Sequence, residues 1–240
     1  MVIDVHCHIL PKVDDGARDS GTTVKMLEMA FQEGIGGMIA TPHYEYGMDR
    51  SVLNKRKKTF EAVRQIAMEM KPEFQMYLGN EIFYSDSTIS ALEEGTALTL
   101  NGTRYVLIEF PVYAEFSDIS RAVRNMQYAG FIPVLAHIER YKGTKKLDQV
   151  RELVELGACM QVNASSVTGK MGWLSQKYVV NLIQKNLVHL LGTDAHGCVH
   201  RRPEMRECLM YLNKKVGVRA ANQLSRINPM KLLGGEEIRG

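Results

Sequence analysis

Short apolar runs recur along the chain at a spacing that predicts alternating strands and helices. These runs are Val2–Val5, Met38–Ala40, Met76–Leu78, Tyr105–Ile108, Pro133–Ala136, Met160–Val162 and Leu187–Leu191. Their first residues lie roughly 27 to 38 positions apart, about the length of one strand, one helix and two loops. Seven such repeats with near-continuously apolar strands predict a parallel sheet covered by helices.

The segments between the runs have the periodicity of amphipathic helices. Thr22–Gln32 and Lys57–Met70 carry apolar residues close to the i, i+3, i+4 spacing. Gly34, Gly130 and Gly157 each follow a helix-like segment and precede an apolar run, which is where helix C-caps occur. We therefore predict a single α/β domain over residues 1–240, folded as a distorted seven-stranded (β/α)7 barrel of the TIM type. A doubly wound sheet is the alternative, although no GxGxxG motif follows the first strand.

The composition is that of an ordinary globular protein and excludes some function classes. Of the 240 residues, 45% are apolar and 24% charged, and the net charge of +3 is too small to indicate a nucleic-acid partner. No apolar stretch is long enough for a membrane span, and Asp4 and His6 stand where a signal peptide would need apolar residues. The four cysteines form no CxxC pair, so we expect a protein of the reducing cytoplasm.

Side chains that bind metals follow six of the seven predicted strands at their carboxyl ends. They are His6, His8, His43, Glu81, Glu109, His137, Asp194 and His196. The carboxyl ends of barrel strands converge on one face, and strand alternation turns His6 and His8 to the same side. About five histidines and four carboxylates are too many donors for one ion, so the pattern indicates two or three bridged ions. The Asp14-Asp15-Gly16 segment taken alone is most simply a turn.

Longer motifs resemble one protein family over nearly the whole chain. They are Ile3–Pro11 (IDVHCHILP), Asp14–Gly16 (DDG), Thr41–His43 (TPH), Asn80–Ile82 (NEI), Leu107–Phe110 (LIEF), Ala136–Tyr141 (AHIERY), Gln161–Ser165 (QVNAS), Thr193–His196 (TDAH) and Arg202–Pro203 (RP). This pattern resembles the PHP (polymerase and histidinol phosphatase) superfamily and, more narrowly, the CpsB/CapC-type bacterial protein-tyrosine phosphatases. The HIERY and LIEF motifs are typical of this branch, whereas HxH is shared by the superfamily.

The resemblance implies a site with three divalent metal ions, most often manganese, with iron, magnesium, cobalt and zinc as alternatives. Its implied ligands are His6, His8, Asp15, His43, Glu81, Glu109, His137, Asp194 and His196. It also implies that Arg140 and Arg202 bind the phosphoryl group.

Two choices between adjacent residues stay open. We prefer Asp15 to Asp14 because of its distance from the HxH motif, and Arg202 to Arg201 because Arg202 precedes a proline.

The expected reaction is hydrolysis of protein phosphotyrosine by a metal-activated hydroxide, with Asp194 as a candidate proton donor. The resemblance implies a phosphotyrosine-containing protein as partner, a cognate bacterial tyrosine kinase that controls capsule or exopolysaccharide synthesis. A thiolate phosphatase would need arginine six residues after its cysteine, but those positions hold Val13, Ser165, Glu204 and Lys214.

Four other functions compete with this one. A PHP enzyme could act on a small phosphate monoester such as histidinol phosphate, and the Lys55–Lys58 run could indicate nucleic-acid cleavage, although such runs are usually solvated helix faces. Amidohydrolases also begin with an HxH motif, but the resemblance there is to eight-stranded barrels, often with a metal-bridging lysine. This chain has Glu109 on its fourth predicted strand instead. A non-catalytic regulator of a tyrosine kinase is disfavoured by the intact set of ligands.

Overall fold

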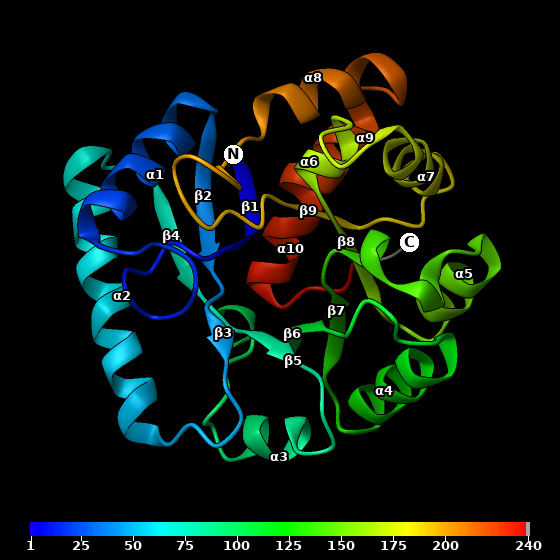
Figure 1. Cartoon of the computed structure of the whole chain (residues 1–240), viewed down its shortest axis with the longest axis horizontal. Coiled ribbons are helices and arrows are strands. Elements are labelled where there is room, and N and C mark those ends of the chain that lie inside the picture. The colour runs from blue at the N-terminus through cyan, green and yellow to red at the C-terminus, as the bar shows by residue number, and fades with distance from the viewer. Residues whose placement is uncertain (239–240) are drawn as a thin grey trace.

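The computed structural model of the chain describes residues 1–238. Strands alternate with helices, and Figure 1 shows the strands in the middle of the molecule with helices around them. The strand segments are β1 Val2–Cys7, β2 Ile35–Ala40, β3 His43–Tyr44, β4 Gln75–Leu78, β5 Glu81–Phe83, β6 Tyr105–Glu109, β7 Ile132–Leu135, β8 Cys159–Asn163 and β9 Leu190–Gly192. The α-helices are α1 Ser20–Gln32, α2 Arg50–Met70, α3 Thr88–Glu93, α4 Phe116–Tyr128, α5 Leu147–Glu155, α6 Ala164–Val167, α7 Trp173–Gln184, α8 Arg206–Lys215, α9 Val218–Asn222 and α10 Asn228–Gly234.

Neighbouring strands are parallel throughout the described sheets. One sheet has the order β1-β2-β4 and the other the order β3-β5-β6-β7-β8-β9. Two residues separate β2 from β3 and two separate β4 from β5, so each of these stretches of chain takes part in both sheets. Strand order follows chain order, whereas a doubly wound sheet reverses direction at a switch point. The predicted α/β class and parallel sheet are confirmed, and the doubly wound alternative is wrong.

The sheet is curled so that the segment after β9 returns to β1. The amide of Asp194 donates to the carbonyl of His6 at 2.8 Å, and the amide of His8 donates to the carbonyl of Ala195 at 2.9 Å. Cys7 and Ala195 form a parallel bridge between these segments. The first strand, β1, and the segment after the last strand, β9, therefore lie side by side.

An apolar cluster fills the inside of the curled sheet. Its strand residues include Ile3, Leu107 and Val134, which are fully buried, and Leu232 and Leu233 of α10 belong to the same cluster. Figure 1 shows α10 across the centre of the molecule. Because these strand residues precede the metal-binding residues in the sequence, α10 covers the amino-terminal end of the strands and leaves their carboxyl ends to the site.

The surrounding helices pack apolar stripes against the outside of the sheet. Helix α2 buries Phe60, Val63 and Ala67, which confirms the periodicity predicted over Lys57–Met70. The helix begins earlier than predicted, because the side chain of Asp49 caps its amino terminus. Helix α1 likewise contains the whole segment predicted from its periodicity.

Glycines mark the ends of three helices where the sequence predicted them. Gly34, Gly130 and Gly157 have φ angles of 77°, 84° and 94°, the left-handed conformation expected after a helix. The run Leu187–Leu191 only partly forms a strand, since β9 begins at Leu190.

Among the described helices, none combines the length and the apolar character that crossing a membrane requires.

Gly192 allows β9 to approach the strands beside it, and substituting it should destabilise the fold. A Cβ atom there would lie 2.6 Å from the Cβ of His6 and 2.9 Å from the Nε2 of Gln161. We expect Gly192→Ala to lower the free energy of unfolding by about 1–3 kcal/mol, measured by denaturant titration. The control Gly197→Ala, whose Cβ would meet its nearest atom at 3.6 Å, should change it by less than about 1 kcal/mol. Equal effects of the two substitutions would contradict this packing argument.

Candidate metal centre

The nine residues implied as ligands come together at the carboxyl ends of the strands. Strands β3 and β5 begin with His43 and Glu81, and β6 ends with Glu109. His137 and Asp194 each lie two residues beyond the ends of β7 and β9 and have φ angles of 32° and 54°. Non-glycine residues seldom adopt this left-handed conformation, which is common at functional sites.

The first group of donors is fully enclosed and contains His6, His8, Glu81 and Asp194, whose ligand atoms lie within 4.8 Å of one another. The Oε2 atom of Glu81 is 3.1 Å from the Nε2 atoms of both His6 and His8. The two Nε2 atoms are themselves 3.1 Å apart. Two imidazoles that direct lone pairs to the same point, next to two carboxylates, form a suitable site for a divalent cation.

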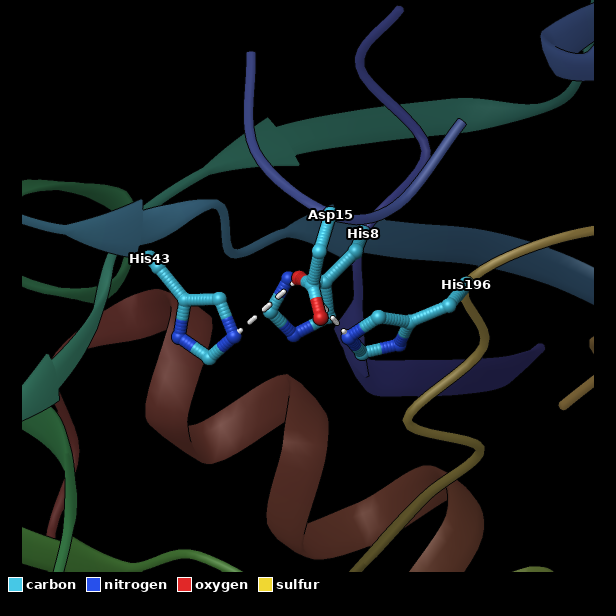
Figure 2. A group of neighbouring side chains, drawn as sticks. All are labelled: His8, Asp15, His43 and His196. Atoms are coloured by element: carbon cyan, nitrogen blue, oxygen red, sulfur yellow. Dashed lines mark ion pairs between the residues drawn. The ribbon is translucent and has the colours of Figure 1, made fainter. Parts of the chain in front are cut away.

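The second group, shown in Figure 2, contains His8, Asp15, His43 and His196. The Oδ1 atom of Asp15 lies 3.4 Å from Nε2 of His43 and 3.3 Å from Nε2 of His196. Nε2 of His196 is buried, and among the described residues its contact with Asp15 does not have the geometry of a hydrogen bond. A buried ring nitrogen that makes no hydrogen bond is costly, and coordination of a cation would satisfy it.

The third group contains His43, Glu81 and Glu109. Nδ1 of His43 is 3.3 Å from a carboxylate oxygen of each glutamate. His137 lies beside this group, with Nε2 at 2.9 Å from Glu81 and 3.7 Å from Glu109. Glu81, His43 and His8 each belong to two of the three groups, so the donors form one continuous cluster with room for more than one ion.

Most of these histidines use their second ring nitrogen to contact a group outside the donor clusters. Nδ1 lies 3.2 Å from the Gln161 amide oxygen in His6, 2.8 Å from the Asp14 carboxylate in His8, and 3.3 Å from the Tyr141 hydroxyl in His137. Such contacts fix the ring orientation and leave Nε2 free to bind a cation. Asp14 therefore orients the His8 ring, whereas Asp15 reaches into the second donor group.

Strand β8 contributes a buried network that reaches three of the implied ligands, His6, His137 and Asp194. Gln161 accepts a bond from the amide of His137 at 2.9 Å and donates to Asn163 at 2.9 Å. The amide of the Asn163 side chain donates to Asp194 Oδ2 at 2.9 Å. The sequence assigned no role to Gln161 or Tyr141, and it offered Asp14 only as the alternative to Asp15 as a ligand. The spacing of 161 and 163 on one strand face was the available signal for Gln161.

The carboxylates dominate the electrostatics of the cluster. Burial lowers the pKa of His6, but the charges of Glu81 and Asp194 outweigh it and raise this pKa to about 9. In His43, burial is outweighed by the hydrogen bond to Glu109 and the charge of Glu81, and the pKa also rises to about 9. Burial would raise the pKa of Glu81, yet the charge of His6 and bonds from the imidazoles hold it well below its usual range. The cluster thus attracts positive charge, which divalent cations can supply by displacing protons.

Three arginines lie at the edge of the donor cluster. Nη2 of Arg140 donates to Asp194 Oδ2 at 2.7 Å, and Nη2 of Arg201 donates to Asp194 Oδ1 at 2.5 Å. Arg202 instead donates to Glu204. All three arginines and Asp194 line one cavity of about 460 Å³. The structure therefore brings Arg140 and Arg201 to the site carboxylate and leaves Arg202 on the cavity wall.

Substitution of Gln161 should weaken cation binding without removing a donor. In Gln161→Leu, His6 loses its Nδ1 contact, and we expect the affinity for divalent cations to fall about 10- to 100-fold in calorimetric titration. Gln65→Leu, on the exposed face of α2, should bind like the wild type. An unchanged affinity in a correctly folded Gln161→Leu variant would remove the orienting role from this network.

Comparison with known proteins assigns the chain to a family. A model of the family "Capsular polysaccharide synthesis, CpsB/CapC" matches residues 2–234. The tyrosine-protein phosphatase CpsB of Streptococcus pneumoniae is 31% identical over 239 residues, which cover 97% of this chain and 98% of CpsB. The tyrosine-protein phosphatase YwqE of Bacillus subtilis (strain 168) is 34% identical over 224 residues, covering 90% of this chain and 85% of YwqE.

A solved structure gives the same result. It comes from crystal structures of YwqE from Bacillus subtilis and CpsB from Streptococcus pneumoniae, described as unique metal-dependent tyrosine phosphatases. It matches this chain with a TM-score of 0.89 at 31% identity and covers 99% of this chain and 96% of its own. The resemblance carried by the sequence motifs is thereby confirmed, and the chain belongs to the CpsB/CapC family.

Proposed function

We propose that this protein is a metal-dependent phosphatase that hydrolyses phosphotyrosine in proteins. The observation that carries the proposal is the continuous cluster of imidazoles and carboxylates around Glu81, beside a cavity lined by arginines. The names of the relatives support the substrate, since CpsB and YwqE are both called tyrosine-protein phosphatases. The description of the matched structure as metal-dependent supports the use of cations.

Three divalent cations are the proposed occupants of the donor cluster, and manganese is the preferred metal. His6, His8, Glu81 and Asp194 would hold one, Asp15, His43 and His196 a second, and Glu81, Glu109 and His137 a third. When bound, such cations lower the pKa of water towards neutrality and neutralise phosphoryl oxygens. The four carboxylates would balance four of the six positive charges, which leaves a net positive centre suited to a phosphate dianion.

Asp194 accepts hydrogen bonds from the arginines on the cavity wall that would face the phosphoryl group. Burial would raise its pKa, but the charges of His6 and His137 outweigh that and hold it well below its usual range. The side chain is therefore ionised at neutral pH, which suits an acceptor for Arg140 and Arg201 better than the proton donor considered from the sequence. A tyrosine leaving group, with an ordinary pKa of about 10, needs less help from an acid than an alkyl alcohol does.

The arginines provide the proposed contacts with the phosphoryl oxygens. Arg140 and Arg201 present guanidinium groups beside Asp194, and such groups bind phosphate with charge-assisted hydrogen bonds. Arg202, chosen from the sequence because it precedes Pro203, is drawn towards Glu204 at the rim. We propose Arg201 as the second phosphoryl-binding residue, with Arg202 as the alternative.

Cys7 and Cys159 are poorly suited to act as nucleophiles. Cys7 is fully buried, and this burial with the nearby carboxylates raises its pKa well above the ordinary value. Burial also raises the pKa of Cys159, to about 12. Because only the thiolate is a competent nucleophile, these surroundings favour hydrolysis by activated water instead.

The proposed architecture is a single-domain (β/α)7 barrel over residues 1–240. In this interpretation β2 with β3, and β4 with β5, are two interrupted strands, and the pairing of the β9 extension with β1 closes the barrel. The proposed partner is the phosphotyrosine-bearing segment of a cytoplasmic tyrosine kinase involved in capsule synthesis. The family description supports that role.

The proposal predicts opposite outcomes for two substitutions. Cys7→Ser should retain most activity on a phosphotyrosyl peptide, whereas Glu109→Ala should lose at least about 100-fold in kcat/KM because a donor disappears. Glu93→Ala, an exposed carboxylate on α3, is the matched control. Chelation should abolish wild-type turnover and added Mn²⁺ should restore it. A chelator-insensitive enzyme that thiol alkylation inactivates would defeat the proposal, and faster turnover of histidinol phosphate than of the peptide would move it to small monoesters.

A second comparison separates the adjacent arginines. Arg201→Ala should lower kcat/KM for para-nitrophenyl phosphate about 100-fold, because a hydrogen-bond donor beside the reacting group is lost. Arg202→Ala should lower it by less than about tenfold, since its guanidinium already pairs with Glu204. The reverse ranking would assign the phosphoryl contact to Arg202.

A further inference from the structure

An exposed apolar surface lies where the chain passes from α6 into α7. We call it the α7 patch and define it as Met171, Trp173 and Leu174, whose exposed fractions are 58%, 67% and 74%. Helix α7 buries Val179 and Leu182 further along, so its first turn presents large apolar side chains to solvent. Tryptophan and methionine on a surface are typical of protein contacts rather than of solvated helix ends.

The α7 patch is continuous with the cavity at the donor cluster. Met171 and its neighbour Lys170 line that cavity together with Asp194 and Arg140. Trp173 and Leu174 line a second cavity. Helix α8 joins the two, because its Cys208 lines the first and Tyr211, one turn later, lines the second. In Figure 1 helices α6, α7 and α8 lie together beside β8.

Basic side chains accompany the apolar residues. Lys177 lies over the ring of Trp173, with Nζ 5.4 Å from the ring centre. Lys170 pairs with Glu204 on the wall of the first cavity. Basic side chains therefore occur at the arginines beside Asp194, at Lys170 on the cavity wall and at Lys177 over the Trp173 ring. A phosphotyrosine with apolar neighbours complements this surface, because its phosphate is anionic and the residues beside it are apolar.

We propose that the α7 patch binds apolar residues that flank the phosphotyrosine in the substrate protein. This rests on the proposed function, because a protein phosphotyrosine in the first cavity must carry its neighbouring residues across the mouth. An extended segment advances about 3.3–3.6 Å per residue, so the residues next to the phosphotyrosine are those within reach of the surface beside the cavity. Burial of Trp173 and Leu174 by such side chains would favour protein substrates over isolated aryl phosphates.

The test uses two phosphotyrosyl peptides of equal length and charge that carry either leucine or serine on both sides of the phosphotyrosine. The wild-type holoenzyme should favour the leucine peptide about tenfold in kcat/KM. The double variant Trp173→Ala/Leu174→Ala should reduce this preference to less than about twofold. Tyr128→Ala is the matched control, because Tyr128 is 97% exposed at the far end of α4 and should keep the tenfold preference.

Turnover of para-nitrophenyl phosphate by each variant separates docking from catalysis, because this substrate has no flanking residues. The inference is supported if the ratio of leucine-peptide to para-nitrophenyl phosphate kcat/KM falls about tenfold in the double variant. Equal wild-type turnover of both peptides would overturn it, as would a preference that survives in the double variant or an equal loss on all substrates. Absence of hydrolysis of every substrate by wild-type protein loaded with Mn²⁺ would refute the phosphatase itself.

Discussion

A buried carboxylate surrounded by imidazole rings is the constraint on which this site depends. Glu81 lies 3.1 Å from His6 and from His8, 3.3 Å from His43 and 2.9 Å from His137. An isolated carboxylate in such a place would cost several kcal/mol. The arrangement is stable only with positive charge among the donors. For the same reason, the neighbouring carboxylates raise the pKa values of His6 and His43.

The curled sheet satisfies this demand because the strands that carry donors place them at the same end of the sheet. Parallel strands place their carboxyl ends together, and α10 fills the opposite end with leucines. Gly192 then allows His6 and Gln161 to lie against β9. Strand β8 supplies no donor to the three groups, but its Gln161 and Asn163 connect His6 with Asp194. Stability at one end of the strands and chemistry at the other are thus separated along each strand.

The sequence was sufficient to predict which histidines and carboxylates gather in one cluster, because such residues after apolar runs have few structural explanations. It also predicted the parallel sheet and the helices at Thr22–Gln32 and Lys57–Met70. It did not predict the short strands β3 and β5, because the apolar runs end at Ala40 and Leu78 and the residues that follow them, Thr41–His43 and Gly79–Glu81, are not apolar. The orienting residues Gln161 and Tyr141 were also missed, and Asp14 was considered only as a ligand in place of Asp15. Their polar groups act through tertiary contacts, which linear spacing does not encode. Arg201 reaches Asp194 from a left-handed backbone conformation that no sequence signal indicated.

The most direct test of the account is a crystal structure of the manganese-loaded protein with anomalous scattering, combined with elemental analysis of the same sample. The account predicts three cations per chain, one for each donor group, with Glu81 contacting two of them. A loaded structure in which no cation contacts Glu81, or a fully active protein that binds no cation, would contradict it.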